Sequence, residues 1–240
     1  MNRIISLELA FVVHSRPFKE TSLIAEFFTR GHGRISAVAK GAKRPKSSLK
    51  EVLSPTSLLR ISCSGKNELK NLTSAEIIEY FPISGSLKLN CTFYLNELLM
   101  KLMEKEDPHP KVFDKYMDVI KILSKESIEI ELEKNLRSFE LILLSELGYG
   151  IDFSREANSG KKIEKDLTYC FDPLKGFVLN KSLQDDRRQL FSGKDILNFA
   201  DGDLSSSQTR KASKNIMRSA LEKHLGERVL NTRKILIEKR

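Results

Sequence analysis

The sequence predicts an α+β protein, in which a five-stranded N-terminal β-barrel precedes a helical domain with an irregular insert. Three observations predict this class. Residues 1–80 contain short segments rich in β-branched and aromatic side chains, separated by turn residues. After Pro82 the apolar residues recur at helical spacing, whereas residues 151–193 have few periodic apolar positions. We therefore predict one domain over residues 1–80 and a second over residues 81–240.

The strands of the first domain are predicted from segments rich in β-branched and aromatic residues that are separated by turn residues. Glycines on either side of His32 suit a tight hairpin that needs positive φ between the second and third strands. Five short strands in about 80 residues are typical of an OB-type barrel. The predicted strands cover residues 8–15, 22–29, 33–41, 57–63 and 68–80.

Three helices are predicted in the first half of the second domain. The first covers residues 91–106, and Pro108 lies just beyond its end. The second covers residues 111–125, and the third covers residues 128–150 and ends at Gly148, where a C-cap glycine is expected. Short connections between the three helices predict a bundle.

The C-terminal region, residues 205–240, is predicted to return to helix. Ser205 with Gln208 three residues later resembles a capping box, and Gly226 follows the last periodic residue. The remaining residues, 227–240, are predicted to form a short amphipathic helix or a frayed end.

Composition narrows the class of protein. The chain has 240 residues, of which 40% are hydrophobic and 30% charged, as in globular proteins. Its net charge of +9 indicates an anionic partner. Glu8 interrupts the apolar N-terminus, and no apolar run reaches the about 18 residues of a membrane span. The three scattered cysteines form no disulfide framework, so a reducing cytoplasm fits best.

Positive charge is concentrated near the third predicted strand, where residues 33–50 contain no acid. The small residues Gly41 and Ala42 would let a phosphate approach the backbone closely. OB barrels bind single strands through basic grooves and stacking aromatics, for which Phe18 is a candidate. A solvated loop is the alternative interpretation. The cations are Arg34, Lys40, Lys43, Arg44, Lys46 and Lys50.

A second group of cations is predicted on the C-terminal helix. Its members fall within one sector, opposite Ala212, Ile216 and Ala220. A plain surface helix explains this pattern equally, and only proximity to the barrel cations would join the two groups. The four residues are Arg210, Lys211, Lys214 and Arg218.

No catalytic or cofactor site is predicted. No Gly-Lys pair is followed by Ser or Thr, so the sequence offers no phosphate loop for a nucleotide. The four histidines are scattered, and no grouping with cysteine suggests a metal. Asp201 and Asp203 suit a helix-capping loop, and the pair Asp185-Asp186 suits a solvated turn. We predict that the protein is not an enzyme and needs no cofactor.

Several segments together resemble the RecO family of bacterial recombination mediators. They are "VVHSRPFKETSLIAEFFTRGHGRISAVAKGAKRPKS", "SAEIIEYF", "YLNELL" and "FELILLSELGYGIDF", in the order and spacing of that family. The resemblance covers residues 9–180. It implies an OB domain, a helical domain and no turnover of nucleotides. It also implies binding of single- and double-stranded DNA, strand annealing, association with RecR and single-strand-binding protein (SSB), and loading of RecA in the bacterial cytoplasm.

The sequence departs from the family at one point. Many relatives carry a four-cysteine zinc module between the "LGYG" helix and the following strand, whereas residues 154–180 contain only Cys170. One thiolate cannot provide the four ligands of a structural zinc site. We therefore expect a metal-free insert, held instead by packing of Phe171, Phe177 and Val178.

The resemblance implies roles for particular residues. The six cations of residues 34–50 would contact phosphates, with Arg16 and Lys19 at the edge of the same face. Arg137 and Leu141, one helical turn apart, would offer a cation and an apolar notch to the acidic, hydrophobic-ended tail of SSB. Two rival hypotheses stay open: a generic OB-fold RNA-binding module and a metal-dependent nuclease.

Overall fold

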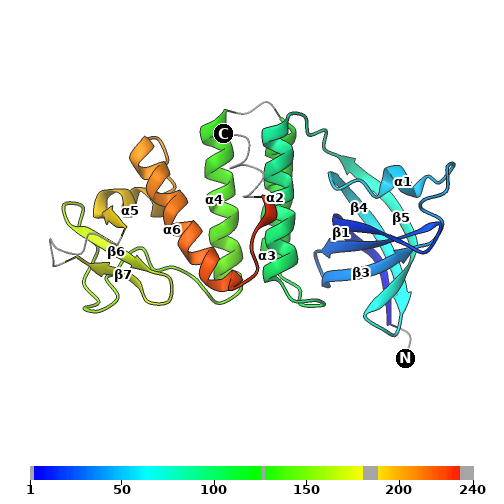
Figure 1. Cartoon of the computed structure of the whole chain (residues 1–240), viewed down its shortest axis with the longest axis horizontal. Helices are drawn as coiled ribbons and strands as arrows, with labels where there is room; N and C mark the ends of the chain where they lie inside the picture. The colour runs from blue at the N-terminus through cyan, green and yellow to red at the C-terminus, as the bar shows by residue number, and fades with distance from the viewer. Residues whose placement is uncertain (1–2, 126–127, 181–188, 233–240) are drawn as a thin grey trace. The chain divides into compact units, whose positions relative to one another are not determined.

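The computed structural model of the chain describes residues 3–125, 128–180 and 189–232 (Figure 1). These residues belong to two compact units, Met1–Glu126 with Leu230–Arg240 and Ser127–Val229. The first unit contains the β-barrel and three of the described helices, and the second contains helices and a small sheet. The α+β class is therefore confirmed.

Five strands form the barrel of the first unit. Neighbouring strands follow the closed order β1-β2-β3-β5-β4, as expected of an OB-like fold. β1 is longer than predicted because its first half pairs with β4 and its second half with β2. The strands are β1 (Arg3–Phe18), β2 (Ser22–Thr29), β3 (Gly33–Ala39), β4 (Ser57–Gly65) and β5 (Leu69–Tyr80).

The barrel interior is filled by apolar side chains. Phe27, Ile35, Leu59 and Ile61 project inward and are essentially inaccessible to solvent. Cys63 shares this core, and burial raises the pKa of its thiol to about 11. This cysteine is therefore protonated at neutral pH and unreactive.

The connection after α2 (Ser86–Leu102) completes the barrel wall beside β3. β3 pairs with β5 only from Ser36 to Val38, which leaves its first residues without a partner on that side. Glu106 N–H donates to the Arg34 carbonyl at 2.9 Å and fills this gap. Gly33, at φ +66°, makes the contact possible, because a Cβ there would lie 2.1 Å from the Asp107 carbonyl oxygen.

An aromatic cluster joins the barrel to α3 (Pro110–Ser124). The rings of Phe11 and Phe28 meet those of Phe113 and Tyr116, with centroid distances between 5.1 and 5.9 Å. Such contacts stabilise by burial and by ring geometry. The predicted boundary at residue 80 falls at the end of β5, but α2 and α3 belong to the same compact unit as the barrel.

The second unit contains a small sheet where an irregular insert was predicted. Its strands follow the order β7-β6-β8 and are each at most five residues long, too short to show periodicity. Phe177 is buried against Phe171 and Phe153, at centroid distances of 5.1 and 5.5 Å, so aromatic packing does hold the insert. The strands are β6 (Thr168–Asp172), β7 (Gly176–Leu179) and β8 (Leu190–Ser192).

Three helices complete the second unit: α4 (Glu129–Glu146), α5 (Gly193–Ala200) and α6 (Ser207–Leu225). The capping prediction at Ser205 was wrong by one residue. The Ser206 hydroxyl, not that of Ser205, accepts from the Thr209 N–H at 3.0 Å, because Thr209 is the third helical residue. α5 was not predicted from the sequence. The Thr209 hydroxyl of α6 donates to the Asp195 carboxylate of α5 at 2.7 Å and so links the two helices.

The chain returns to the first unit at its C-terminal end. Leu230 is only 3% exposed, and the Glu97 carboxylate of α2 accepts from the Asn231 and Thr232 N–H groups at 2.8 and 3.0 Å. Burial opposes ionisation of Glu97, but these hydrogen bonds outweigh it and hold the pKa of the carboxyl below its ordinary value. Ionised Glu97 therefore stabilises the docked segment.

We expect Glu97→Gln to lower the free energy of unfolding by about 1 kcal/mol at pH 7, because a charge-assisted acceptor is lost. A carboxyl with a depressed pKa in the folded state stabilises above its unfolded pKa, and this stabilisation is lost as the pH falls through the folded pKa. The difference between the two proteins should therefore shrink as the pH drops below 4.5. Urea titrations at several pH values measure it, with exposed Glu79→Gln as the control. A difference independent of pH would contradict this role.

Candidate nucleic-acid interface

Residues 40–50, the basic loop, form an ordered series of turns after β3. Ala42 is fully buried, and Lys43 N–H donates to the Thr21 carbonyl of the β1–β2 turn at 2.9 Å. Arg44 N–H and Ser47 N–H close successive turns at 3.0 Å each. The loop ends in the short helix α1 (Leu49–Val52). Because the backbone is tied at both ends, the cationic side chains project from a rigid support.

The cations of the basic loop are exposed and carry no carboxylate partner. Within the part of the chain that the structure describes, none of them lies in an ion pair. Their mutual repulsion is therefore relieved only by solvent, by salt or by a bound polyanion. These residues are Lys40, Lys43, Arg44, Lys46 and Lys50.

The two small residues of the loop also have structural roles. Gly41 has φ +72°, and a Cβ there would lie 3.5 Å from the Arg44 side chain, so the arginine covers the glycine. Ala42 is small because it packs into the barrel core. Ala42 is therefore closed to a phosphate, whereas close approach to the partly exposed Gly41 stays a prediction.

The β1–β2 turn adjoins the basic loop through the Lys43–Thr21 hydrogen bond. Lys19 lies in this turn with φ +52°, and its Nζ is 5.4 Å from the centroid of the half-buried Phe18 ring. Arg16 is exposed two residues before Phe18. The turn and the loop thus form one basic surface, defined here by Arg16, Lys19 and the five cations of the basic loop.

Arg34 does not belong to this surface, and its expected phosphate contact was wrong. The residue is 7% exposed, and its guanidinium donates to the Met103 carbonyl and the Met100 sulfur, both at 3.1 Å. Glu26 lies 3.9 Å away and partly balances its charge. Every residue of β3 is buried, and Arg34, which alternates with the core residues Ile35 and Ala37, joins the barrel to the end of α2.

The four predicted cations of α6, a helix of the second unit, differ in their exposure and in their partners. Arg210 donates to the Leu204 and Ser205 carbonyls at 3.0 and 2.8 Å, and its Nε lies 3.5 Å from Glu133. Arg218 pairs with Glu222 at 2.8 Å. Lys211 and Lys214 are exposed on α6. Arg210 therefore stabilises the start of α6, whereas the two lysines are accessible to an anion.

Arg137 and Leu141 lie one turn apart on α4, as expected, but neither is fully exposed. The Arg137 side chain pairs with the carboxylate of Glu140, which is buried, at 2.8 Å. Part of the guanidinium is thereby engaged inside the unit. A peptide bound here would have to accept hydrogen bonds from the guanidinium N–H groups of Arg137 that do not face Glu140.

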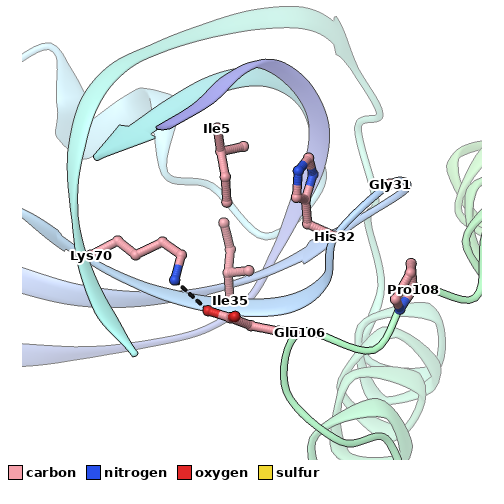
Figure 2. Close-up of a pocket in the computed structure, with 7 residues that line it drawn as sticks. All are labelled: Ile5, Gly31, His32, Ile35, Lys70, Glu106 and Pro108. Atoms are coloured by element: carbon pink, nitrogen blue, oxygen red, sulfur yellow. Dashed lines mark hydrogen bonds and ion pairs between the residues drawn. The ribbon is translucent and has the colours of Figure 1, made fainter. Parts of the chain in front are cut away.

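Two hollows lie against the barrel wall. The smaller, of about 70 Å³, contains the buried Lys70, which pairs with Glu106 beside Ile5, Ile35 and His32 (Figure 2). The larger, of about 230 Å³, is lined partly by Lys105, whose Nζ lies 2.9 Å from the Ser36 hydroxyl. Small-molecule pockets begin at about 300 Å³, so neither hollow is a substrate site of usual size. The Lys70–Glu106 and Lys105–Ser36 contacts hold the α2–α3 connection to the barrel, and no local sequence signal revealed them.

The described residues show neither a metal-binding cluster nor a membrane-spanning helix. They contain no group of three or more His, Cys, Asp or Glu side chains placed to hold a metal ion. The same residues contain no helix with the length and apolar character needed to cross a membrane.

Comparison with known proteins identifies the family. The pattern described as "Recombination protein O N terminal" matches residues 4–81, and that described as "Recombination protein O C terminal" matches residues 86–234. The chain belongs to the RecO family. The RecO resemblance is thereby confirmed, and the two matches meet just after the end of β5.

Relatives from several bacteria are similar to this chain along nearly its whole length. The "DNA repair protein RecO" of Polynucleobacter asymbioticus is 42% identical over 232 residues, covering 96% of this chain and 95% of the relative. That of Burkholderia pseudomallei is 41% identical over 230 residues, covering 95% and 82%. The Haemophilus influenzae protein of the same name is 39% identical over 232 residues, covering 97% and 96%.

Proposed function

We propose that this protein is a DNA-binding mediator of recombinational repair that anneals complementary single strands. The observation that carries the proposal is the exposed basic surface on an OB-like barrel, whose loop cations lie in no ion pair among the described residues. Membership of the RecO family and the names of its relatives support a role in DNA repair. Side chains that grip phosphates bind without reading sequence, which suits a mediator that acts at any gap.

Annealing follows from the charge of this surface. Two single strands repel each other through their phosphates, and a cationic surface that holds both removes much of that repulsion. Contacts confined to the backbone leave the base edges free to pair. The reaction consumes no nucleotide, so the protein acts without enzymatic turnover.

The proposed partners extend this activity. The protein binds single- and double-stranded DNA, and with RecR it helps to load RecA on SSB-coated gaps in the bacterial cytoplasm, in association with the nucleoid. RecA is reached indirectly, after SSB has been contacted through its C-terminal tail. Neither a cofactor nor a membrane is needed.

A strand-annealing assay with SSB-coated complementary oligonucleotides tests the proposal. The protein should accelerate annealing at 50 mM salt and much less at 300 mM, because counterion release drives binding. Labelled DNA should stay full-length with magnesium, and unlabelled RNA should compete less well than single-stranded DNA. Degraded strands would favour a nuclease, and stronger competition by RNA would favour an RNA-binding module.

The proposed SSB contact needs a double variant, because Arg137→Ala alone leaves the Glu140 carboxylate buried without its arginine. We expect the variant Arg137→Ala/Glu140→Gln to keep its thermal midpoint but to bind a labelled SSB tail peptide at least about tenfold more weakly. Fluorescence anisotropy measures the affinity, with Glu140→Gln alone as the control. Equal affinity of both variants would remove Arg137 from the contact.

A further inference from the structure

An aromatic stack lies at the surface of the second unit, where the end of α4 meets the last turn of α6. Tyr149 follows Gly148, which has φ +84°, and its N–H donates to the Leu144 carbonyl at 2.8 Å. Its ring lies almost parallel to the His224 imidazole, with the centroids 3.7 Å apart and 16° between the planes. The helix end therefore sets the position of the phenol ring.

The stack is partly exposed. Tyr149 is 48% exposed although His224 covers one face of its ring, so much of the residue outside this contact is accessible to solvent. Burial, with a smaller effect of Lys223, lowers the pKa of His224 below its ordinary value. The imidazole is therefore uncharged at neutral pH, and the two rings form a flat apolar platform.

Charges of both signs surround the platform. Lys223 is exposed beside His224 and interacts electrostatically with Asp172 of β6, and the Arg228 guanidinium donates to the Leu225 and His224 carbonyls at 3.1 and 3.2 Å. The Tyr149 ring itself is uncharged, so a ligand that lies on it would bind through its own flat ring. Unstacked nucleobases are such rings, and proteins that bind single strands hold them on aromatic side chains.

We infer that Tyr149, backed by His224, is a stacking platform for a nucleobase of single-stranded DNA. The inference rests on the proposed function, since it assigns a base contact to a protein whose basic surface holds phosphates. The two contacts differ in their physical signature. Phosphate binding weakens steeply with salt, whereas stacking of a base on the uncharged Tyr149 ring does not.

The test exploits the absence of tryptophan from the chain. Tyr149→Trp introduces a single indole, whose emission at pH 8 should be quenched by an oligothymidylate. Phe93→Trp is the matched control, because Phe93 on α2 is also 48% exposed. Anisotropy of a labelled oligonucleotide reports binding in the same samples, and an abasic oligonucleotide should bind without quenching the indole.

Affinity provides a second readout. Tyr149→Leu should weaken binding to the oligothymidylate about tenfold, by a factor that is the same at 50 and 300 mM salt, while Tyr149→Phe keeps the affinity. The thermal midpoint of both variants should match that of the parent. Binding without quenching, or a Tyr149→Leu effect that disappears with salt, overturns the platform but leaves the proposed function standing. Absence of any DNA binding overturns both.

Discussion

Replacing Lys43, Arg44 and Lys46 together by alanine is expected to lower the affinity for single-stranded DNA roughly 100-fold near 0.1 M salt. If each side chain neutralises one phosphate, the slope of log affinity against log salt should become shallower by about 2, since each contact contributes roughly 0.7. All three side chains are exposed and unpaired with carboxylates among the described residues, so the loss is one of contact and not of folding. Anisotropy titrations at four salt concentrations measure both quantities.

A charge-matched control separates local contact from net charge. Lys161, Lys162 and Lys165 are exposed in the second unit, and their joint replacement by alanine removes the same three charges elsewhere. We expect this control to change the affinity less than about threefold and to leave the slope nearly unchanged. Equal effects of the two triple variants would mean that net charge, and not the basic surface, drives binding.

Gly33→Ala is expected to destabilise the first unit by about 3–5 kcal/mol. A left-handed backbone costs an alanine about 1–2 kcal/mol, and overpacking adds a similar or larger amount. The overpacking is severe here, because the new Cβ would lie 2.1 Å from the Asp107 carbonyl oxygen and would push the α2–α3 connection off β3. Urea denaturation followed by circular dichroism measures the loss.

Gly41→Ala is the matched control for this strain. Gly41 lies at the other end of β3 with a similar φ of +72°, but a Cβ there would meet only the Arg44 side chain, at 3.5 Å. Its cost should be limited to the about 1–2 kcal/mol of backbone strain. If both variants lost the same stability, the close approach of Asp107 to Gly33 would not be holding the connection in place.

Local pattern was enough to predict the barrel and most helices. Strands of seven or more residues, such as β2 and β3, are rich in apolar residues and bounded by turn residues, and α3 and α4 carry apolar residues at helical spacing. The small sheet of the insert escaped prediction because its strands are too short to show a period. The cap of α6 was misplaced because adjacent serines at 205 and 206 offer the same hydroxyl, and only the turn geometry selects Ser206.

The candidate site could likewise be predicted only in part from the sequence. Charge patterning pointed to the cations of residues 34–50, of which the five exposed ones in the basic loop remain candidates, but it could not show that Arg34 is buried against the end of α2. Nor could it show that Tyr149 and His224, 75 positions apart, lie face to face.

The sequence by itself determined the α+β class, the RecO family and the concentration of positive charge after β3, because composition, period and motif order are properties of neighbouring residues. The tertiary structure alone decided which cations reach solvent, how the α2–α3 connection completes the barrel wall and where an aromatic stack stays exposed. These features depend on contacts between residues far apart in the chain, and the burial that they impose changes both the charge and the accessibility of a side chain.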